Sequence, residues 1–221
     1  MSDSLRPHGF SLFGLDIYWY ALVITTGILL CVLNGLKLGK RYGINEDDFS
    51  DVIMFGILMG IICARVYYVI FSPVKYTSFL EMINIRDGGL AIYGGIIGGL
   101  GFGALACKVK KLNILKVVDI ASLCFLLGQA VGRWGNFFNQ EAFGTNTDSL
   151  FGMISEGTTA YLRYAASKLA AQGITVDPYS PVHPTFLYES VWCLVGFAAL
   201  SAYIDRKKFD GEILLMYLFW Y

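Results

Sequence analysis

The sequence is poor in charged residues. Lys, Arg, Asp and Glu make up only 15% of its 221 residues, whereas soluble domains usually carry about 25%. Hydrophobic residues supply 56% of the chain, and its mean hydropathy is +0.56. This composition excludes an ordinary soluble domain and indicates an integral membrane protein.

The sequence also lacks an excess of either charge. Seventeen Lys and Arg balance seventeen Asp and Glu, so the formal net charge is zero. A protein that binds nucleic acid normally presents a basic field to the phosphates. The charge balance therefore predicts no nucleic-acid partner.

Several motifs that indicate particular chemistries are missing. The sequence contains no HExxH, GxSxG or P-loop motif, so metal-dependent, serine-nucleophile and nucleotide chemistry lack support. The five cysteines lie in apolar runs and form no CxxC pair. We interpret them as buried reduced thiols, and we expect neither a metal nor a cofactor.

Long apolar runs are what the sequence does contain. Five runs approach the roughly 20 residues that a membrane-spanning helix needs, and they cover about 17–36, 50–71, 89–107, 117–138 and 185–204. A sixth begins at Gly211 and is too short to cross, so we expect the chain to stop inside a helix. The first run has no A-x-A cleavage site after it, which favours a retained span over a signal peptide. We expect an all-α, polytopic membrane helix bundle, a single transmembrane domain over 1–221 with five full spans and a partial sixth.

Basic residues alternate between the loops as the positive-inside rule requires. The loops after the first, third and fifth runs hold ten of the seventeen Lys and Arg, and the N-terminus with the two other loops holds five. This asymmetry predicts an N-terminus outside the cytoplasm. It also predicts an extracytoplasmic excursion at about 139–182, with a candidate amphipathic helix at "TAYLRYAASKLAAQ".

One stretch concentrates polar groups at the end of the fourth run. "GRWGNFFNQEAFG", residues 132–144, places Arg133, Asn136 and Glu141 directly behind an apolar segment. An intramembrane Arg costs several kcal/mol unless it is paired or faces water, so it is a functional-site candidate by default. Arg133 and Asn136 share a helix face, and an Arg fork can bind phosphate through two hydrogen bonds. The alternative interpretation is an Arg133–Glu141 ion pair that only ties helices together.

Further candidates lie near the ends of the other runs. Arg65 stands beside Tyr67 and Tyr68, where a snorkelling Arg in an aromatic belt is the alternative interpretation. Tyr93 lies between glycine pairs that otherwise indicate close helix packing, and Tyr20 in "YWYAL" is more typical of an aromatic belt.

A second group of candidates precedes the fifth run. "HPTFLYE" supplies His183, Tyr188 and Glu189, and for His183 a structural cap and a chemical role remain equally open. All these polar groups are expected in the outer half of the membrane. A membrane-embedded cavity that contains arginines favours an anionic amphiphile such as a phospholipid headgroup.

The polar stretch also carries a resemblance. "GRWGNFFNQEAFG" resembles the signature of prolipoprotein diacylglyceryl transferases, roughly G-R-x-G-N-F-x-N-x-E-x-x-G, and meets every fixed position from Gly132 to Gly144. "YWYAL", "ARVYYVIF", "DGGLAIYGG" and "HPTFLYE" resemble other blocks of that family, in the family's order. The resemblance therefore covers nearly the whole chain.

The resemblance implies a reaction and a location. Members of this family transfer an sn-1,2-diacylglyceryl group from phosphatidylglycerol to the lipobox cysteine thiol of a prolipoprotein and release glycerol phosphate. The implied partners are phosphatidylglycerol, prolipoprotein lipobox peptides and membrane lipid. The implied location is the bacterial cytoplasmic (inner) membrane, with the active site toward the outer face. The alternative from another class is a non-catalytic lipid-binding protein or transporter, although transporters often contain internal repeats and none is visible here.

The resemblance also assigns roles to residues. Catalytic roles are expected for Arg133, Tyr93, Glu141 and His183. Roles in binding phosphatidylglycerol are expected for a larger set: Arg133, Asn136, Arg65, Tyr20, Tyr68, Gly144, Tyr188 and Glu189.

The chain departs from the family pattern in two respects. Many members carry His where this chain has Tyr93, and a tyrosine holds its proton far more tightly than a histidine at neutral pH. We therefore expect Tyr93 to position the thiol while His183 or Glu141 accepts its proton. The family also continues beyond Tyr221 with a second functional Arg, so we expect the 221-residue chain alone to transfer little or nothing.

Overall fold

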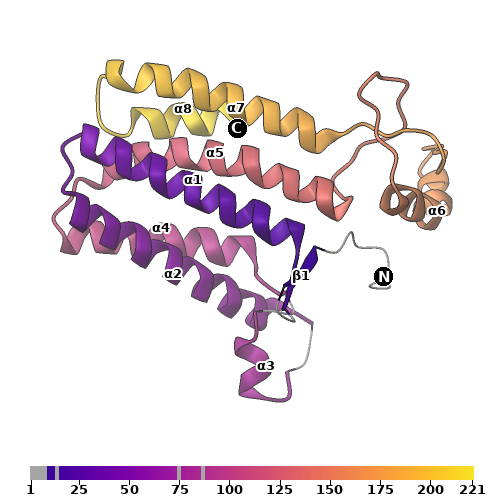
Figure 1. Cartoon of the computed structure of the whole chain (residues 1–221), viewed down its shortest axis with the longest axis horizontal. Coiled ribbons are helices and arrows are strands. Elements are labelled where there is room, and N and C mark those ends of the chain that lie inside the picture. The colour runs from indigo at the N-terminus through magenta and orange to yellow at the C-terminus, as the bar shows by residue number, and fades with distance from the viewer. Residues whose placement is uncertain (1–8, 13–14, 74–75, 86–87) are drawn as a thin grey trace. The chain divides into compact units, whose positions relative to one another are not determined.

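The computed structural model describes residues 9–12, 15–73, 76–85 and 88–221, and most of them are helical (Figure 1). A short antiparallel ribbon, β1 (Phe10–Leu12) with β2 (Leu15–Ile17), precedes the helices. The helices are α1 (Trp19–Arg41), α2 (Glu46–Phe71), α3 (Phe79–Ile83), α4 (Ile92–Val109), α5 (Ile114–Asn139), α6 (Glu156–Ala171), α7 (Thr185–Tyr203), the 3₁₀ turn η2 (Ile204–Arg206) and α8 (Glu212–Trp220).

Five helices are long and apolar enough to cross a membrane. They are α1, α2, α4, α5 and the combined stretch Thr185–Arg206. Each coincides with one of the five apolar runs in the sequence, which confirms the all-α polytopic bundle. The nine residues of α8 are too few to cross, as expected for the sixth run. The β1–β2 ribbon was not expected.

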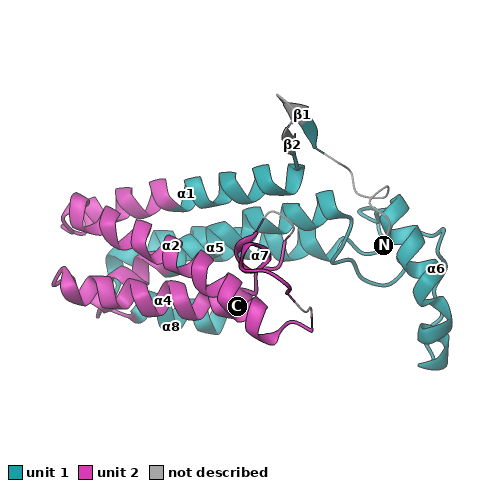
Figure 2. Ribbon diagram, turned by 90° about the horizontal axis from the view of Figure 1, so that it is seen from below, with its two compact units in different colours: residues 1–31, 122–208, 212–221 teal, residues 32–121, 209–211 magenta. Residues whose placement is uncertain are grey.

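The described chain divides into two compact units (Figure 2). Unit 1 comprises residues 1–31, 122–208 and 212–221, and unit 2 comprises residues 32–121 and 209–211. Both α1 and α5 contribute residues to each unit. The single transmembrane domain over 1–221 and the excursion at 139–182 stay predictions.

Glycines bring α2 and α4 close together in unit 2. A Cβ at Gly94 would overlap the backbone oxygen of Cys63, and a Cβ at Gly98 would lie 2.6 Å from the Cys63 sulfur. Gly60 also lies against the backbone of α4, at a looser distance, because a Cβ there would lie 3.4 Å from the Gly95 oxygen. The glycine-rich run is therefore a helix-packing surface, as its spacing indicated.

Polar groups fix the other end of the same helix pair. Asn45 caps α2 by accepting the backbone N–H of Asp48. The ammonium of Lys110, which follows α4, lies 2.9 Å from the Asp48 carboxylate and 2.5 Å from that of Asp51. These contacts join the N-terminal end of α2 to the C-terminal end of α4.

In unit 1, α5 packs against both α1 and α7. The Ser190 hydroxyl on α7 donates to the Ala130 carbonyl at 2.8 Å and accepts the Trp134 indole N–H at 3.2 Å. On the α1 side, the thiols of Cys31 and Cys124 each donate to the other residue's backbone carbonyl, at 3.0 and 3.2 Å. All five cysteines of the chain are free thiols.

The segment between α5 and α7 is ordered around α6, which lies beyond the ends of these two helices (Figure 1). The capping box of α6 is formed by Ser155 and Thr158. Val182 makes β-bridges to Asn146 and Met153. The Gln140 side chain accepts the Gly157 N–H at 2.6 Å, so the beginning of α6 is tied to the end of α5.

Candidate functional site

Arg133 lies in the last two turns of α5 and is paired with a carboxylate on another helix. Its Nη2 forms an ion pair with Oε1 of Glu189 on α7. The Tyr221 hydroxyl accepts a hydrogen bond from the same Nη2 at 3.2 Å and donates to Glu189 at 2.8 Å. The Glu189 carboxylate compensates the charge of Arg133, as a charge near hydrocarbon requires, and the Tyr221 hydroxyl bridges the two by hydrogen bonds.

The pairing leaves part of the guanidinium available. Among the described residues, the Nε and Nη1 atoms of Arg133 have no hydrogen-bond partner, and its side chain is 29% exposed. These nitrogens can therefore donate to an oxyanion while Nη2 stays anchored on Glu189. This is the geometry that a phosphate-binding Arg needs.

A second polar contact lies one helical turn away and joins α5 to α8. The amide of Gln129 on α5 donates to the Tyr217 hydroxyl at 3.1 Å, and the Tyr217 and Tyr221 rings stack with their centroids 6.2 Å apart. Both pairs repeat at i, i+4, so they occupy one face of each helix. Sequence reasoning missed these residues, although the spacing of four was visible.

Glu141 follows the end of α5 and is held by two amides. The Nδ2 atoms of Asn136 and Asn139 donate to its Oε1 at 3.2 and 3.0 Å. The structural Arg133–Glu141 pair that we considered is therefore wrong, because the carboxylate that pairs with Arg133 is Glu189. Glu141 instead lies in an amide cluster where the chain leaves the helix.

Three of the predicted residues meet at the beginning of α7. The His183 Nδ1 lies 3.0 Å from the Tyr188 hydroxyl, and the Gly144 N–H donates to the His183 carbonyl at 2.9 Å. A Cβ at Gly144 would lie 3.0 Å from the His183 Cβ, so the close approach favours glycine. The structure thus joins the end of the 132–144 motif to the "HPTFLYE" segment.

Tyr20 packs against Gly135 of α5, next to the Asn136–Glu141 contact. A Cβ at Gly135 would lie 2.8 Å from the Tyr20 ring, so this ring occupies the space that the missing side chain leaves. Gly135 directly precedes Asn136 in α5. Tyr20 therefore borders the polar end of α5 from the α1 side, and 42% of its surface is exposed.

In unit 2, Arg65 is buried and bonded to backbone. Only 9% of its surface is exposed, and it donates to four carbonyl oxygens at 2.7–2.9 Å, those of Glu81, Met82, Gly88 and Gly89. The Tyr68 ring lies 5.7 Å from the guanidinium carbon. The snorkelling interpretation of Arg65 is therefore wrong.

Tyr93 opens α4 in unit 2 with its side chain 67% exposed. The ring that lies near it is that of Tyr67, at a centroid distance of 6.4 Å. Unit 2 thus holds Arg65, Tyr68 and Tyr93, and within it Arg65 and Tyr68 lie together. The predicted site residues other than these three belong to unit 1.

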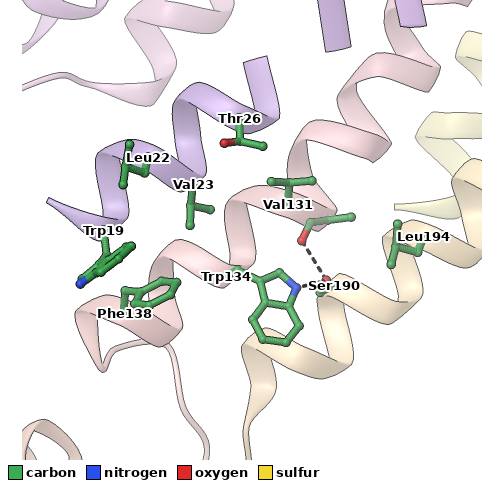
Figure 3. A pocket seen from close by; sticks show the side chains of 10 residues that line it. Trp19, Leu22, Val23, Thr26, Val131, Trp134, Phe138, Ser190 and Leu194 are labelled. Atoms are coloured by element: carbon green, nitrogen blue, oxygen red, sulfur yellow. Dashed lines mark hydrogen bonds between the residues drawn. The ribbon is translucent and has the colours of Figure 1, made fainter. Parts of the chain in front are cut away.

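An apolar groove of about 450 Å³ runs along unit 1 beside the polar C-terminal end of α5 (Figure 3). Two polar groups in its lining hydrogen-bond to each other, because the Trp134 indole N–H donates to the Ser190 hydroxyl. Such a surface suits a hydrocarbon chain. The groove is lined by α1, α5 and α7 through Trp19, Leu22, Val23, Thr26, Ala130, Val131, Trp134, Phe138, Ser190 and Leu194. Within the described part of the chain, no three His, Cys, Asp or Glu side chains are grouped to hold a metal ion.

Comparison with known proteins agrees with the resemblance seen in the sequence. A family model described as prolipoprotein diacylglyceryl transferase matches residues 7–221. Three curated relatives carry the name phosphatidylglycerol–prolipoprotein diacylglyceryl transferase. The protein of Clostridioides difficile (strain 630) is 40% identical over 210 residues, covering 95% of this chain and 76% of the relative. That of Finegoldia magna is 42% identical over 214 residues, covering 96% and 77%. That of Limosilactobacillus reuteri (strain DSM 20016) is 40% identical over 224 residues, covering 99% and 77%.

Proposed function

The chain belongs to the prolipoprotein diacylglyceryl transferase family, and on that premise we propose how its residues transfer a diacylglyceryl group from phosphatidylglycerol to a prolipoprotein. It is a transferase and a multi-pass bacterial membrane protein. The non-catalytic lipid-binding protein or transporter is not favoured, because the relatives are named as transferases.

The transfer exchanges one bond for another at a glycerol carbon. The lipobox thiol loses its proton, and the resulting thiolate attacks the carbon that bears the phosphate. A carbon–sulfur bond forms as the carbon–oxygen bond breaks, and the electron pair leaves with the oxygen of glycerol phosphate. The site must therefore stabilise a phosphate leaving group and accept one proton.

The observation that carries this proposal is that, among the described residues, only one of the three guanidinium nitrogens of Arg133 is engaged in contacts. Glu189 and Tyr221 hold Nη2, and this anchoring fixes the side chain before substrate arrives. In the described part of the chain Nε and Nη1 have no partner, so they can donate to the phosphate oxygens. Donors that are already oriented toward developing charge are worth more than mobile ones.

For the proton acceptor we propose His183. Histidine is the side chain that ordinarily changes charge between pH 5 and 8, and the Tyr188 hydroxyl at Nδ1 fixes the ring orientation. Glu141 is less suited because Asn136 and Asn139 already donate to its Oε1. Glu141 then serves to shape the end of α5.

The remaining predicted residues receive supporting roles. Asn136, Tyr20, Gly144, Tyr188 and Glu189 border the Arg133 end of α5 or hold the groups that do. For Tyr68 and Arg65 in unit 2 we also propose a role in binding phosphatidylglycerol. Arg65 at the same time donates four hydrogen bonds to backbone carbonyl oxygens. Tyr93 is proposed to position the lipobox thiol.

The proposed orientation follows from the basic residues of the loops. We place the protein in the cytoplasmic membrane, with the N-terminus, the 139–182 excursion and the site toward the outer face. The ten-to-five distribution of Lys and Arg supports this orientation. The membrane delivers phosphatidylglycerol laterally, and the prolipoprotein peptide arrives from the same leaflet.

The decisive experiment measures transfer directly. The protein is purified and mixed with phosphatidylglycerol labelled in its diacylglyceryl group and a synthetic lipobox peptide. We expect a labelled thioether on the peptide cysteine and an equal amount of free glycerol phosphate. Lipid binding without peptide labelling would support the non-catalytic alternative instead. A peptide with Ser in place of the lipobox cysteine is the matched control.

A further inference from the structure

The short helix α3 carries large apolar side chains on its surface. Phe79 and Leu80 are each 74% exposed, and Ile83 is 53% exposed. No residue of α3 is buried. We call this surface the α3 patch, and it comprises Phe79, Leu80, Met82, Ile83 and Ile85.

Hydrogen bonds join Glu81 of α3 to the two residues that precede the helix, Thr77 and Ser78. Ser78 caps the helix by accepting the Glu81 N–H at 3.3 Å. The Glu81 carboxylate in turn accepts the Thr77 N–H at 2.9 Å and the Thr77 hydroxyl at 2.8 Å. These hydrogen bonds hold the pKa of Glu81 below its usual range. The helix therefore has one polar edge, at Glu81, and an otherwise apolar surface.

A helix of five residues does not form on its own, because nucleation costs more than so few hydrogen bonds return. Burial against the protein does not stabilise α3 either, since none of its side chains is buried. Something else must hold it in place. Two features of unit 2 indicate what that is.

The first feature is Arg65, which fixes the backbone on both sides of the helix end. It donates to the carbonyls of Glu81 and Met82 within α3, and to those of Gly88 and Gly89 beyond it. Gly89 has a φ of +80°, and a Cβ there would lie 2.6 Å from the Tyr68 ring. The segment is thus clamped to the C-terminal part of α2, and α3 lies beyond that end of α2 (Figure 1).

The second feature is the surface that adjoins the α3 patch. Ile70 and Phe71 end α2 and are 66% and 68% exposed, while Ile92 begins α4 and is 71% exposed. Both helices are long and apolar enough to cross a membrane, so exposed apolar side chains on them are suited to contact with lipid. The α3 patch lies beyond the end of α2 that carries Ile70 and Phe71, and it extends this apolar surface past the spanning segment.

We propose that α3 is an interfacial membrane anchor, whose patch inserts into the boundary between headgroups and acyl chains, and that Arg65 is the residue that positions it. The partner is lipid hydrocarbon, in the leaflet at the C-terminal end of α2. Glu81 and Thr77 form the polar edge toward the headgroups. Apolar helices that lie in this boundary bury one face while their polar edge stays hydrated.

The test measures the depth of a fluorophore at Leu80. The full chain with Leu80→Cys is labelled with an environment-sensitive maleimide and placed in lipid nanodiscs, whose two faces are both open to water. Lipids brominated near the ester end of the acyl chain should quench about half of the fluorescence, because interfacial helices insert only about 5–10 Å. Lipids brominated near the methyl end should quench much less. The unsubstituted protein, treated identically, gives the background from native thiols.

The matched control is Asp47→Cys, an exposed position in the first turn of α2 at the other end of that helix. Its fluorophore should be quenched by aqueous iodide and not by brominated lipid. A Leu80 label that is as accessible to iodide as the Asp47 label would overturn the anchor. Protection of the Leu80 label from both iodide and brominated lipid, seen only in discs that hold two copies, would overturn it too, in favour of a dimer contact.

Arg65→Gln tests the positioning role in the Leu80→Cys background. We expect the bromolipid quenching at Leu80 to fall at least twofold, because a Gln side chain cannot reach four carbonyls. Unchanged quenching would contradict the role of Arg65. If Arg65→Gln does not fold, Arg65→Lys replaces it. Lys keeps the charge but has a single donor group, so the same loss of quenching is expected, and retention of full quenching would overturn the positioning role.

Discussion

The carboxylate of Glu189 on α7 is the ion-pair partner of Arg133 on α5, although 55 residues separate the two in the sequence. The Tyr221 hydroxyl contacts both groups. Among the residues that the structure describes, the guanidinium is therefore paired and anchored through Nη2 alone. An anion that enters the site meets an Arg whose orientation is already fixed.

Arg133→Lys should lower kcat/KM for transfer by about tenfold or more, a loss of at least ~1.4 kcal/mol in transition-state stabilisation. A Lys ammonium can replace the ion pair with Glu189, but its three donors share one nitrogen, so it cannot form the bidentate contact that a guanidinium fork makes to phosphate. The measurement is labelled-lipid transfer to a lipobox peptide. Arg163→Lys, at an exposed position on α6, is the control and should leave kcat/KM unchanged. Full activity of Arg133→Lys would mean that Arg133 only balances charge.

Glu189→Gln should destabilise the protein, because it leaves Arg133 without its counter-charge. Removing one partner of a fully buried pair costs about 3–5 kcal/mol. These side chains are 29% and 32% exposed, so we expect a smaller loss of about 1–2 kcal/mol after solvent screening. Thermal unfolding in detergent measures it. In a double-mutant cycle, Arg133→Gln with Glu189→Gln should recover part of the loss, and simple additivity would show that the pair is not coupled.

The spanning helices were predictable from the sequence because the thickness of the hydrocarbon dictates their length. The close α2–α4 packing was predictable for a similar reason, since only glycines permit backbones to meet at Gly94 and Gly98. The 132–144 motif also drew attention to Arg133, because a charge in such a run needs a partner.

The partners themselves were not predictable. Glu189 became the partner of Arg133 only because α7 packs beside α5, and Glu141 was nearer in the sequence. Arg65 donates to backbone carbonyl oxygens. Because every residue has such an oxygen, no sequence pattern indicates which ones an Arg will bind. Tertiary packing decides such pairings, whereas periodicity reports only on one helix at a time.

Gly94→Ala should destabilise unit 2 by about 1–3 kcal/mol, which is the usual cost of overpacking. The new methyl group would overlap the backbone oxygen of Cys63, which cannot move away as a side chain can. Gly101→Ala in the same helix is the matched control, because nothing lies within 4 Å of its Cβ position. It should be neutral or stabilise by up to ~1 kcal/mol through helix propensity. Equal effects in thermal unfolding would contradict the packing argument.

Acid should loosen the loop that carries Asp177. The Ser180 hydroxyl at 2.6 Å and the Tyr179 N–H at 2.9 Å hold the pKa of Asp177 below its ordinary value of 3.8. Its folded pKa is thus lower than its unfolded pKa, so this stabilisation is complete above about pH 4 and disappears as the pH falls through the folded value. Cleavage of the 139–182 segment by pepsin should accelerate below pH 3.8. Asp177→Asn should be cleaved at a rate that depends less on pH, and an unchanged pH dependence would remove Asp177 as the cause.

The orientation of the chain can be tested with one cysteine in the 139–182 excursion. Ser155 is a poor position, because its side chain caps α6 and its loss would disturb the helix. Tyr164 on the same helix is 88% exposed, so Tyr164→Cys should leave the fold intact. The distribution of Lys and Arg places this segment outside the cytoplasm. An impermeant maleimide should therefore label Tyr164→Cys in intact spheroplasts. Asp47→Cys lies in the first turn of α2, shortly after the basic last turn of α1 with Lys40 and Arg41, and should react only after lysis. The opposite result for both positions would invert the whole topology and move the Arg133 cluster to the cytoplasmic side.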